Sequence, residues 1–151
     1  MSQKRADTPS DFQIKSGEIP SFSVSEPIRI VNAQTPSSDV ILPAPPYKLI
    51  INYKQYTDTA IKLLAGEIEK RGGKISEDAS KVIKVSIIDV KIATTVKFRC
   101  IINFTVETGD AYFKGFEVAG GSWNYEKAID LAMANVVVGI LNNERILRYL
   151  K

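Results

Sequence analysis

The chain has 151 residues, of which 44% are hydrophobic, and a formal net charge of +3. This composition predicts one globular unit with an apolar core, and because basic and acidic residues are interspersed, it gives little reason to expect a polyanionic partner. The sequence contains no histidine and a single cysteine, Cys100. Ser-His-Asp and Cys-His catalysis, histidine-ligated zinc and an internal disulfide are therefore excluded.

The first 20 residues are polar and show no periodicity, so we expect a flexible N-terminal arm over 1–20 and a single α+β domain over 21–151. Residues 1–5 are not followed by the apolar stretch of a signal peptide, and no apolar run reaches the ~20 residues of a membrane span. Residues 27–32 predict a first strand. The proline-rich segment 43–46 predicts a stiff connector into a second strand at 47–53.

A first helix is expected to begin near Thr57 or Asp58, because either side chain can accept hydrogen bonds from the free amides of the first turn. Arg71 suits the last turn, and Gly72 followed by Gly73 is a typical stop. One buried stripe is predicted at i, i+3, i+4 and i+7, formed by Ile61, Leu64, Ala65 and Ile68.

The segment 83–118 alternates apolar and polar residues and predicts three consecutive antiparallel strands. The apolar phase shifts at Ile87 and Ile88, which indicates a β-bulge, and Gly109-Asp110 is a hairpin signal. Cys100 shares the apolar phase of the central strand, so we interpret it as a buried small hydrophobe and not as a reactive thiol.

A second helix is expected from a cap at Ser122 or Asn124 to about Leu141, and a short helix is favoured over an edge strand for 144–150. Together the elements predict an α+β two-layer sandwich, with an antiparallel sheet of four or five strands and two helices on one face. Trp123 at the entrance of the second helix is interpreted as a hydrophobic staple on the core, with a place on a binding surface as the alternative.

The odd-numbered face of the central strand is left for a partner or for solvent. We name as candidate partner-binding residues Lys97, Arg99, Ile101, Asn103 and Lys114, and Lys97, Arg99 and Lys114 are expected to form a basic stripe on the open sheet face. No phosphate-binding or calcium-loop motif is present, and the carboxylates lie in predicted turns. We therefore predict no catalytic residue, cofactor or metal site, and no enzymatic activity.

Four segments carry a resemblance to a known family: Tyr56-Thr57-Asp58, Lys70-Arg71-Gly72, the hairpin at 106–110 and the segment 141–146. With the order of elements, they make residues 22–150 similar to bacterial lipoproteins of the YajG type. This resemblance implies an exported accessory domain in the periplasm, tethered to the outer membrane by a lipidated N-terminal cysteine. The sequence departs from that family in having no leader and no lipid-attachment cysteine.

Two functional hypotheses follow. The first is a non-enzymatic accessory domain of a cell-envelope lipoprotein that binds another envelope protein or a second copy of itself. The alternative is a cytosolic binding module that takes nucleic acid or another anion on the open sheet face. A signal peptide with a lipid-attachment cysteine upstream in the native gene would favour the first, whereas steeply salt-dependent nucleic-acid binding is required by the second.

Overall fold

The three consecutive strands expected from the alternating segment form three of the four strands of the larger sheet in the computed structural model, which describes residues 2–6, 14–15, 17–35 and 38–151. Strands β5 (Lys81–Thr94), β6 (Phe98–Thr108) and β7 (Phe113–Ser122) pair antiparallel in consecutive hairpins, as predicted. Strand β2 (Ile28–Asn32) confirms the expected first strand, and it pairs parallel with β5 on the outer side. The sheet order is β2-β5-β6-β7.

The predicted β-bulge in β5 is confirmed. Ile87 lies opposite Phe104 and Asp89 lies opposite Asn103, so Ile88 is the extra residue of the bulged strand. Ile87 and Val90 are both buried on the helix side, while Ile88 is 51% exposed. The bulge therefore changes the phase of β5 and keeps one face of a long strand against the core.

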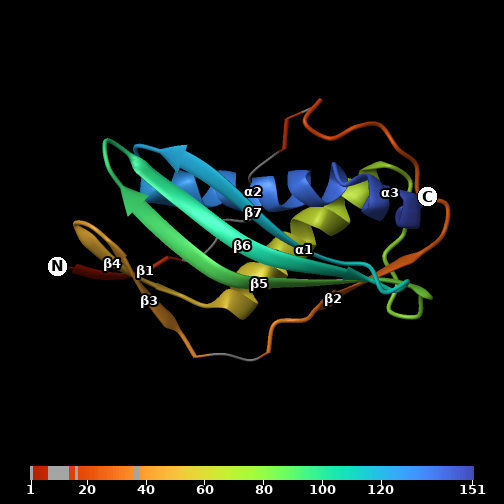
Figure 1. Ribbon diagram of the computed structural model, residues 1–151, viewed down its shortest axis with the longest axis horizontal. Helices are drawn as coiled ribbons and strands as arrows, with labels where there is room; N and C mark the ends of the chain where they lie inside the picture. Colours follow the sequence, from red (N-terminus) through yellow and green to blue (C-terminus); the bar gives the residue numbers. More distant parts are fainter. Residues whose placement is uncertain (1, 7–13, 16, 36–37) are drawn as a thin grey trace.

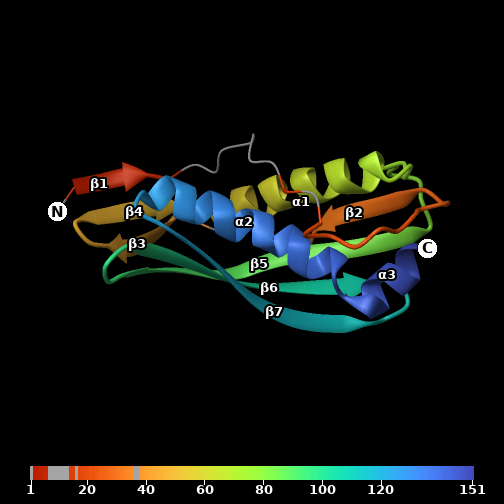
Figure 2. The same cartoon turned by 90° about the horizontal axis from the view of Figure 1, so that it is seen from above.

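Helices α1 (Tyr53–Lys70) and α2 (Tyr125–Leu141) cover one face of this sheet, and α3 (Glu144–Leu150) packs at the end where the chain finishes (Figures 1 and 2). Asn124 caps α2, because its side chain accepts from the backbone N–H of Glu126 at 2.8 Å. The expected bounds of α2 and the short final helix are thus confirmed. The staple interpretation of Trp123 is wrong, since this side chain is 73% exposed.

Helix α1 begins one turn earlier than the sequence indicated. Asn52 is its N-cap and accepts from the backbone N–H of Gln55 at 3.1 Å. Thr57, expected near the cap, is instead fully buried in the first turns and accepts from the backbone N–H of Ile87 at 3.0 Å. The end is as predicted, with Arg71 as the C-cap and Gly72 at a φ of +84°.

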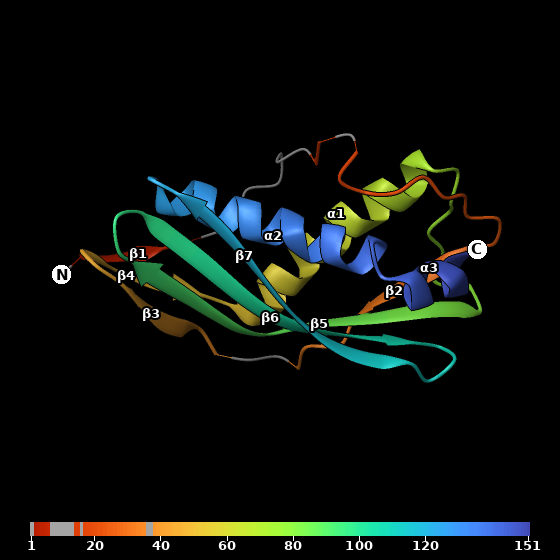
Figure 3. The same ribbon diagram turned by 45° about the horizontal axis from the view of Figure 1, so that its top comes forward.

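A second, smaller sheet has the order β1-β4-β3, with β1 (Ser2–Arg5), β3 (Val40–Ala44) and β4 (Tyr47–Ile51) (Figure 3). The stiff connector expected at 43–46 is wrong: Pro43 lies in β3, opposite Lys48, and β3 and β4 form a hairpin. Proline is tolerated there because β3 is an outer strand. Of the arm expected over 1–20, residues 1, 7–13 and 16 lie outside the described part, while Ser2–Arg5 pairs parallel with β4.

The fold class is therefore the predicted α+β two-layer sandwich, with mixed sheets instead of a purely antiparallel one. The core lies between the helices and the larger sheet, where Phe104 and Phe116 stack with ring centroids 4.8 Å apart. Cys100 is completely buried in this core, as expected. None of the described helices has the length and hydropathy needed to cross a membrane.

Candidate partner-binding face

The larger sheet turns one face to α1 and α2 and the other face away from them, and we call the second the open face (Figure 2). Its members follow from strand register, because residues directly opposite each other point to the same side. On β6 it comprises the odd-numbered residues from Arg99 to Glu107. Its partners on the flanking strands are Lys84, Ser86, Asp89, Lys91 and Ala93 on β5, and Phe113, Gly115, Glu117, Ala119 and Gly121 on β7.

Three of the candidate residues lie together on this face. Arg99 is exposed, and Ile101 and Asn103 are half-buried in the middle of the sheet. Asn103 lies between Asp89 and Glu117. The central positions of the odd-numbered face are thus arranged as the alternation predicted.

The expected basic stripe of three residues does not form, because Lys114 lies on the other side of the sheet. Lys97 is in the turn between β5 and β6 and not in a strand, and its side chain lies over Gly121 at the end of the open face, where a Cβ on Gly121 would be 3.3 Å from Cε of Lys97. Lys114 lies opposite Val106, which is buried on the helix side, and its Nζ sits 5.8 Å from the ring centroid of Phe116. The phase of β7 could not be read from the sequence before its register with β6 was known.

The charges of the open face alternate in sign. Asp89 and Lys91 are successive residues on the open side of β5, and Nζ of Lys91 lies 3.8 Å from Oδ2 of Asp89. Lys84 lies opposite Glu107, and Arg29 of β2 lies opposite Val82 beside them. Arg29, Lys84 and Glu107 line a hollow of about 320 Å³ at one end of the face, together with Ser80, Val82, Thr108, Gly109 and Ala111. A surface that carries both signs favours the binding of neither a polyanion nor a polycation.

The border of the open face includes a contact that the sequence did not predict. The hydroxyl of Ser86 donates to Oε1 of Gln34 at 2.8 Å, and Ser86 is only 8% exposed as a result. Gln34 itself is held by its backbone N–H, which donates to the Asn32 side chain at 3.0 Å. The chain after β2 thus covers the sheet next to the bulge. No sequence pattern marks Gln34 for this contact.

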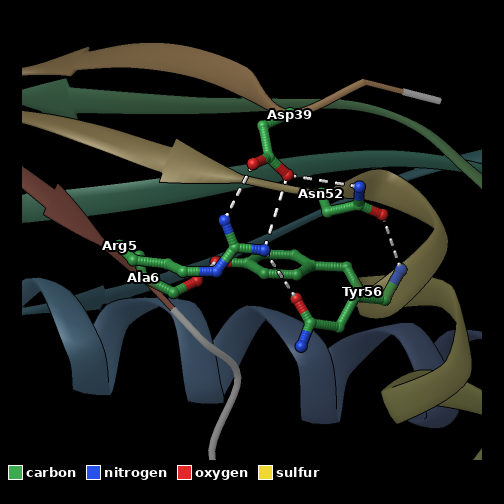
Figure 4. A network of polar contacts seen from close by, with 6 residues as sticks. Arg5, Ala6, Asp39, Asn52 and Tyr56 are labelled. Atoms are coloured by element: carbon green, nitrogen blue, oxygen red, sulfur yellow. Dashed lines mark hydrogen bonds and ion pairs between the residues drawn. The ribbon is translucent and has the colours of Figure 1, made fainter.

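A polar network joins the smaller sheet to the start of α1 (Figure 4). Arg5 and Asp39 form an ion pair at 2.9 Å, and Asn52 donates to Asp39 at 3.3 Å. The hydroxyl of Tyr56 is buried and donates to the carbonyl of Ala6 at 2.7 Å. The hydrogen bond from Arg5, followed by that from Asn52, lowers the pKa of Asp39 below 3.8. These contacts connect elements of the fold, and we assign them a structural role.

The hollow beside the end of α1 and the buried thiol of Cys100 both lack the features of a chemical site. A hollow of about 440 Å³ lies beside the end of α1, but its carboxylate, Glu67, is bonded to Arg71 at 2.8 Å and to Lys70 at 3.2 Å. Burial raises the pKa of the Cys100 thiol to about 12, so its nucleophilic thiolate is not formed near neutral pH. In the described part of the chain, no three His, Cys, Asp or Glu side chains gather to hold a metal.

Comparison with known proteins identifies the fold and no more. No protein-family model matches the sequence, and no curated protein matches it. A solved structure from Xanthomonas campestris, described under family DUF330, is similar with 10% identity and a TM-score of 0.59, covering 91% of this chain and 92% of that one. An uncharacterized protein has 8% identity and a TM-score of 0.49, with 99% and 98% covered. The chain therefore shares its fold with the DUF330 structure.

Proposed function

We propose that this chain is a non-enzymatic accessory domain of a bacterial cell-envelope lipoprotein and that it binds another protein through the open face. The observation that supports this most directly is the middle of that face. Ile101, Asn103 and Thr105 are only half-buried, and α1 and α2 both lie on the opposite side of the sheet. A broad strand surface with an aliphatic centre and alternating charges suits a protein partner, which can match both signs.

The same charges make nucleic acid the weaker alternative. A polyanion requires basic groups gathered on one face, because its affinity comes from neutralised phosphates. Here Arg99 and Lys91 share the face with Asp89 and Glu117, and Lys114 points to the helix side. The alternative predicts binding that falls steeply with salt, and the absence of binding at low salt would remove it.

The envelope location and the lipid tether are supported by the resemblance to YajG-type lipoproteins. The absence of enzymatic activity is supported by the same resemblance and by the burial of Cys100. The partner is either another envelope protein or a second copy of the chain. Arg99 and Asn103 lie opposite residues of both β5 and β7, so a partner that contacts them would lie across the middle of the open face.

Affinity capture from native membranes tests the proposal when wild type is compared with two variants. The first combines Arg99→Glu with Asn103→Arg, which reverses one charge and adds another on the open face. The matched control is Lys62→Glu, an exposed position on α1 in the other layer. We expect the control to retain the wild-type partner and the double variant to lose it, with equal thermal stability. Retention of the same partner by both variants would contradict the proposal.

A further inference from the structure

Two apolar side chains project from one end of the molecule and have no part in the open-face function. Val96 is 79% exposed in the turn between β5 and β6, and Trp123 is 73% exposed between β7 and α2. Because Phe98 pairs with Ser122 in the last pair of β6 and β7, Val96 and Trp123 both lie beyond the same end of the sheet. Together they present exposed apolar surface at one end of the sheet, and the tryptophan ring adds a polar N–H that suits a contact surface.

These two side chains lie next to a base of three packed aromatic rings. The ring of Tyr125 lies 5.3 Å from that of Tyr47 and 6.0 Å from that of Phe98, between ring centroids. This base joins the beginnings of β4, β6 and α2, which meet at the end where β1 begins (Figures 1 and 3). The turn with Val96 and the junction with Trp123 are thus anchored to secondary structure on both sides.

The same end carries a surplus of lysines. Lys4 places its Nζ 4.5 Å from the ring centroid of Tyr47, and Lys97 is exposed beside Val96. Lys48 at the start of β4 and Lys127 in the first turn of α2 are also exposed, and Glu126 is the acidic residue among them. We call this set the aromatic end: Lys4, Tyr47, Val96, Lys97, Trp123 and Tyr125.

We propose that the aromatic end is a contact site for an anionic lipid surface. Tryptophan is favoured at the level of lipid headgroups because its ring is apolar and its N–H is polar, and lysines are attracted to anionic headgroups. Val96 and Trp123 lie in two separate connections at the same end, so both can touch one lipid surface. The lysines complement the negative charge of that surface. The molecule then stands end-on on the membrane, with the open face at its side. This proposal does not depend on the open face having a protein partner.

Trp123 is the single tryptophan of the chain, so its fluorescence reports directly on this site. The purified full chain is mixed with vesicles of phosphatidylcholine alone or of an equimolar mixture of phosphatidylcholine and phosphatidylglycerol. We expect a blue shift with the anionic vesicles that weakens as salt is raised, and quenching by lipids brominated in the acyl chain. An unchanged spectrum with anionic vesicles at low salt would overturn the proposal.

Co-sedimentation with the same vesicles separates this site from the rest of the surface. Val96→Asp and Lys97→Glu, each made alone, are expected to weaken binding about tenfold or more. The matched control is Phe113→Ser, which removes a side chain that is 64% exposed at the other end of β7. Its binding is expected to equal that of wild type. Binding that survives both changes at the aromatic end, or an equal blue shift with soluble polyglutamate, would refute a lipid-specific contact.

Discussion

Replacing Gly120 by alanine would place a methyl group against the backbone of α2. A Cβ at this position would lie 2.7 Å from the carbonyl oxygen of Ala128 and 2.7 Å from Cβ of Leu131, whereas ordinary contacts are 3.4–4 Å. The neighbouring contact between Asn135 and the carbonyl of Ala119, at 2.7 Å, holds the helix at this short distance. Helix α2 would therefore have to move away from β7 by several tenths of an ångström or more.

The cost follows from the atoms involved. Because the new methyl group meets helix backbone and not the end of a flexible side chain, the strain cannot be relieved by one rotamer change. Overpacking of this kind costs about 1–3 kcal/mol in free energy of unfolding. For a chain of this size each kcal/mol lowers the melting temperature by about 2–4 °C. Urea titration followed by circular dichroism, together with thermal melting, measures both quantities.

The matched control is Gly115→Ala in the same strand. A Cβ at Gly115 would meet no atom within 4 Å, and glycine in a strand is unfavourable in itself. We therefore expect Gly115→Ala to be neutral or slightly stabilising. Equal stability of the two variants would refute the close approach of α2 to β7 at Gly120.

Three other predictions test the interior and the polar network. Thr57→Val leaves the buried N–H of Ile87 without its acceptor and should cost about 1–3 kcal/mol in urea unfolding, whereas Thr57→Ser should cost less; equal losses would contradict this role. Cys100 should react with a thiol reagent at pH 8 only after unfolding, because burial raises its pKa to about 12; rapid labelling of the folded protein would show that it is accessible. Arg5→Gln should raise the pKa of Asp39 toward 3.8, as followed by NMR titration. Since the folded pKa is lowered, the ion pair stabilises the fold above pH 3.8 and loses this effect as the pH falls through the folded pKa; an unchanged pKa in the variant would remove Arg5 as the cause.

The parts of the fold that could be predicted are those with a strong local pattern. The alternation from 98 to 107 predicted the correct faces of β6, and the neighbouring isoleucines of β5 marked the bulge, whereas Val96, in the same apolar phase, lies exposed in the turn before β6. Asn124 caps α2, as one of the two expected capping side chains. In each case the residues that form the pattern also make the observed contact, within a few positions of one another in the sequence or along one strand.

The parts that could not be predicted depend on long-range contacts. The start of α1 was expected near Thr57 or Asp58, because either side chain can cap a helix and a strand was expected over 47–53. Asn52 is the cap instead, and Thr57 accepts a hydrogen bond from the backbone N–H of Ile87 in β5. Strand β1 is polar and pairs with β4, which lies more than 40 residues away, so no local periodicity marks it. The same reason explains Lys114: its side depends on the register of β7 with β6.

Trp123 illustrates a different difficulty. A tryptophan before a helix is compatible with a staple on the core or with an exposed contact, and only the packing around it distinguishes them. The core beneath α2 is filled by other side chains, so Trp123 stays at the surface. The candidate face on β6, in contrast, depended on alternation alone, which is why Arg99, Ile101 and Asn103 lie where they were expected.

The central claim is that the open face binds a protein, and site-specific photocrosslinking tests it most directly. A photoreactive amino acid is placed at Ile101 on the open face and, as a control, at Lys62 on the exposed side of α1. Each full-length variant is irradiated in native membranes and analysed by mass spectrometry. We predict one defined protein adduct, or a defined adduct of two copies of this chain, from position 101 and not from position 62. The same adducts from both positions, or none from position 101, would contradict the claim.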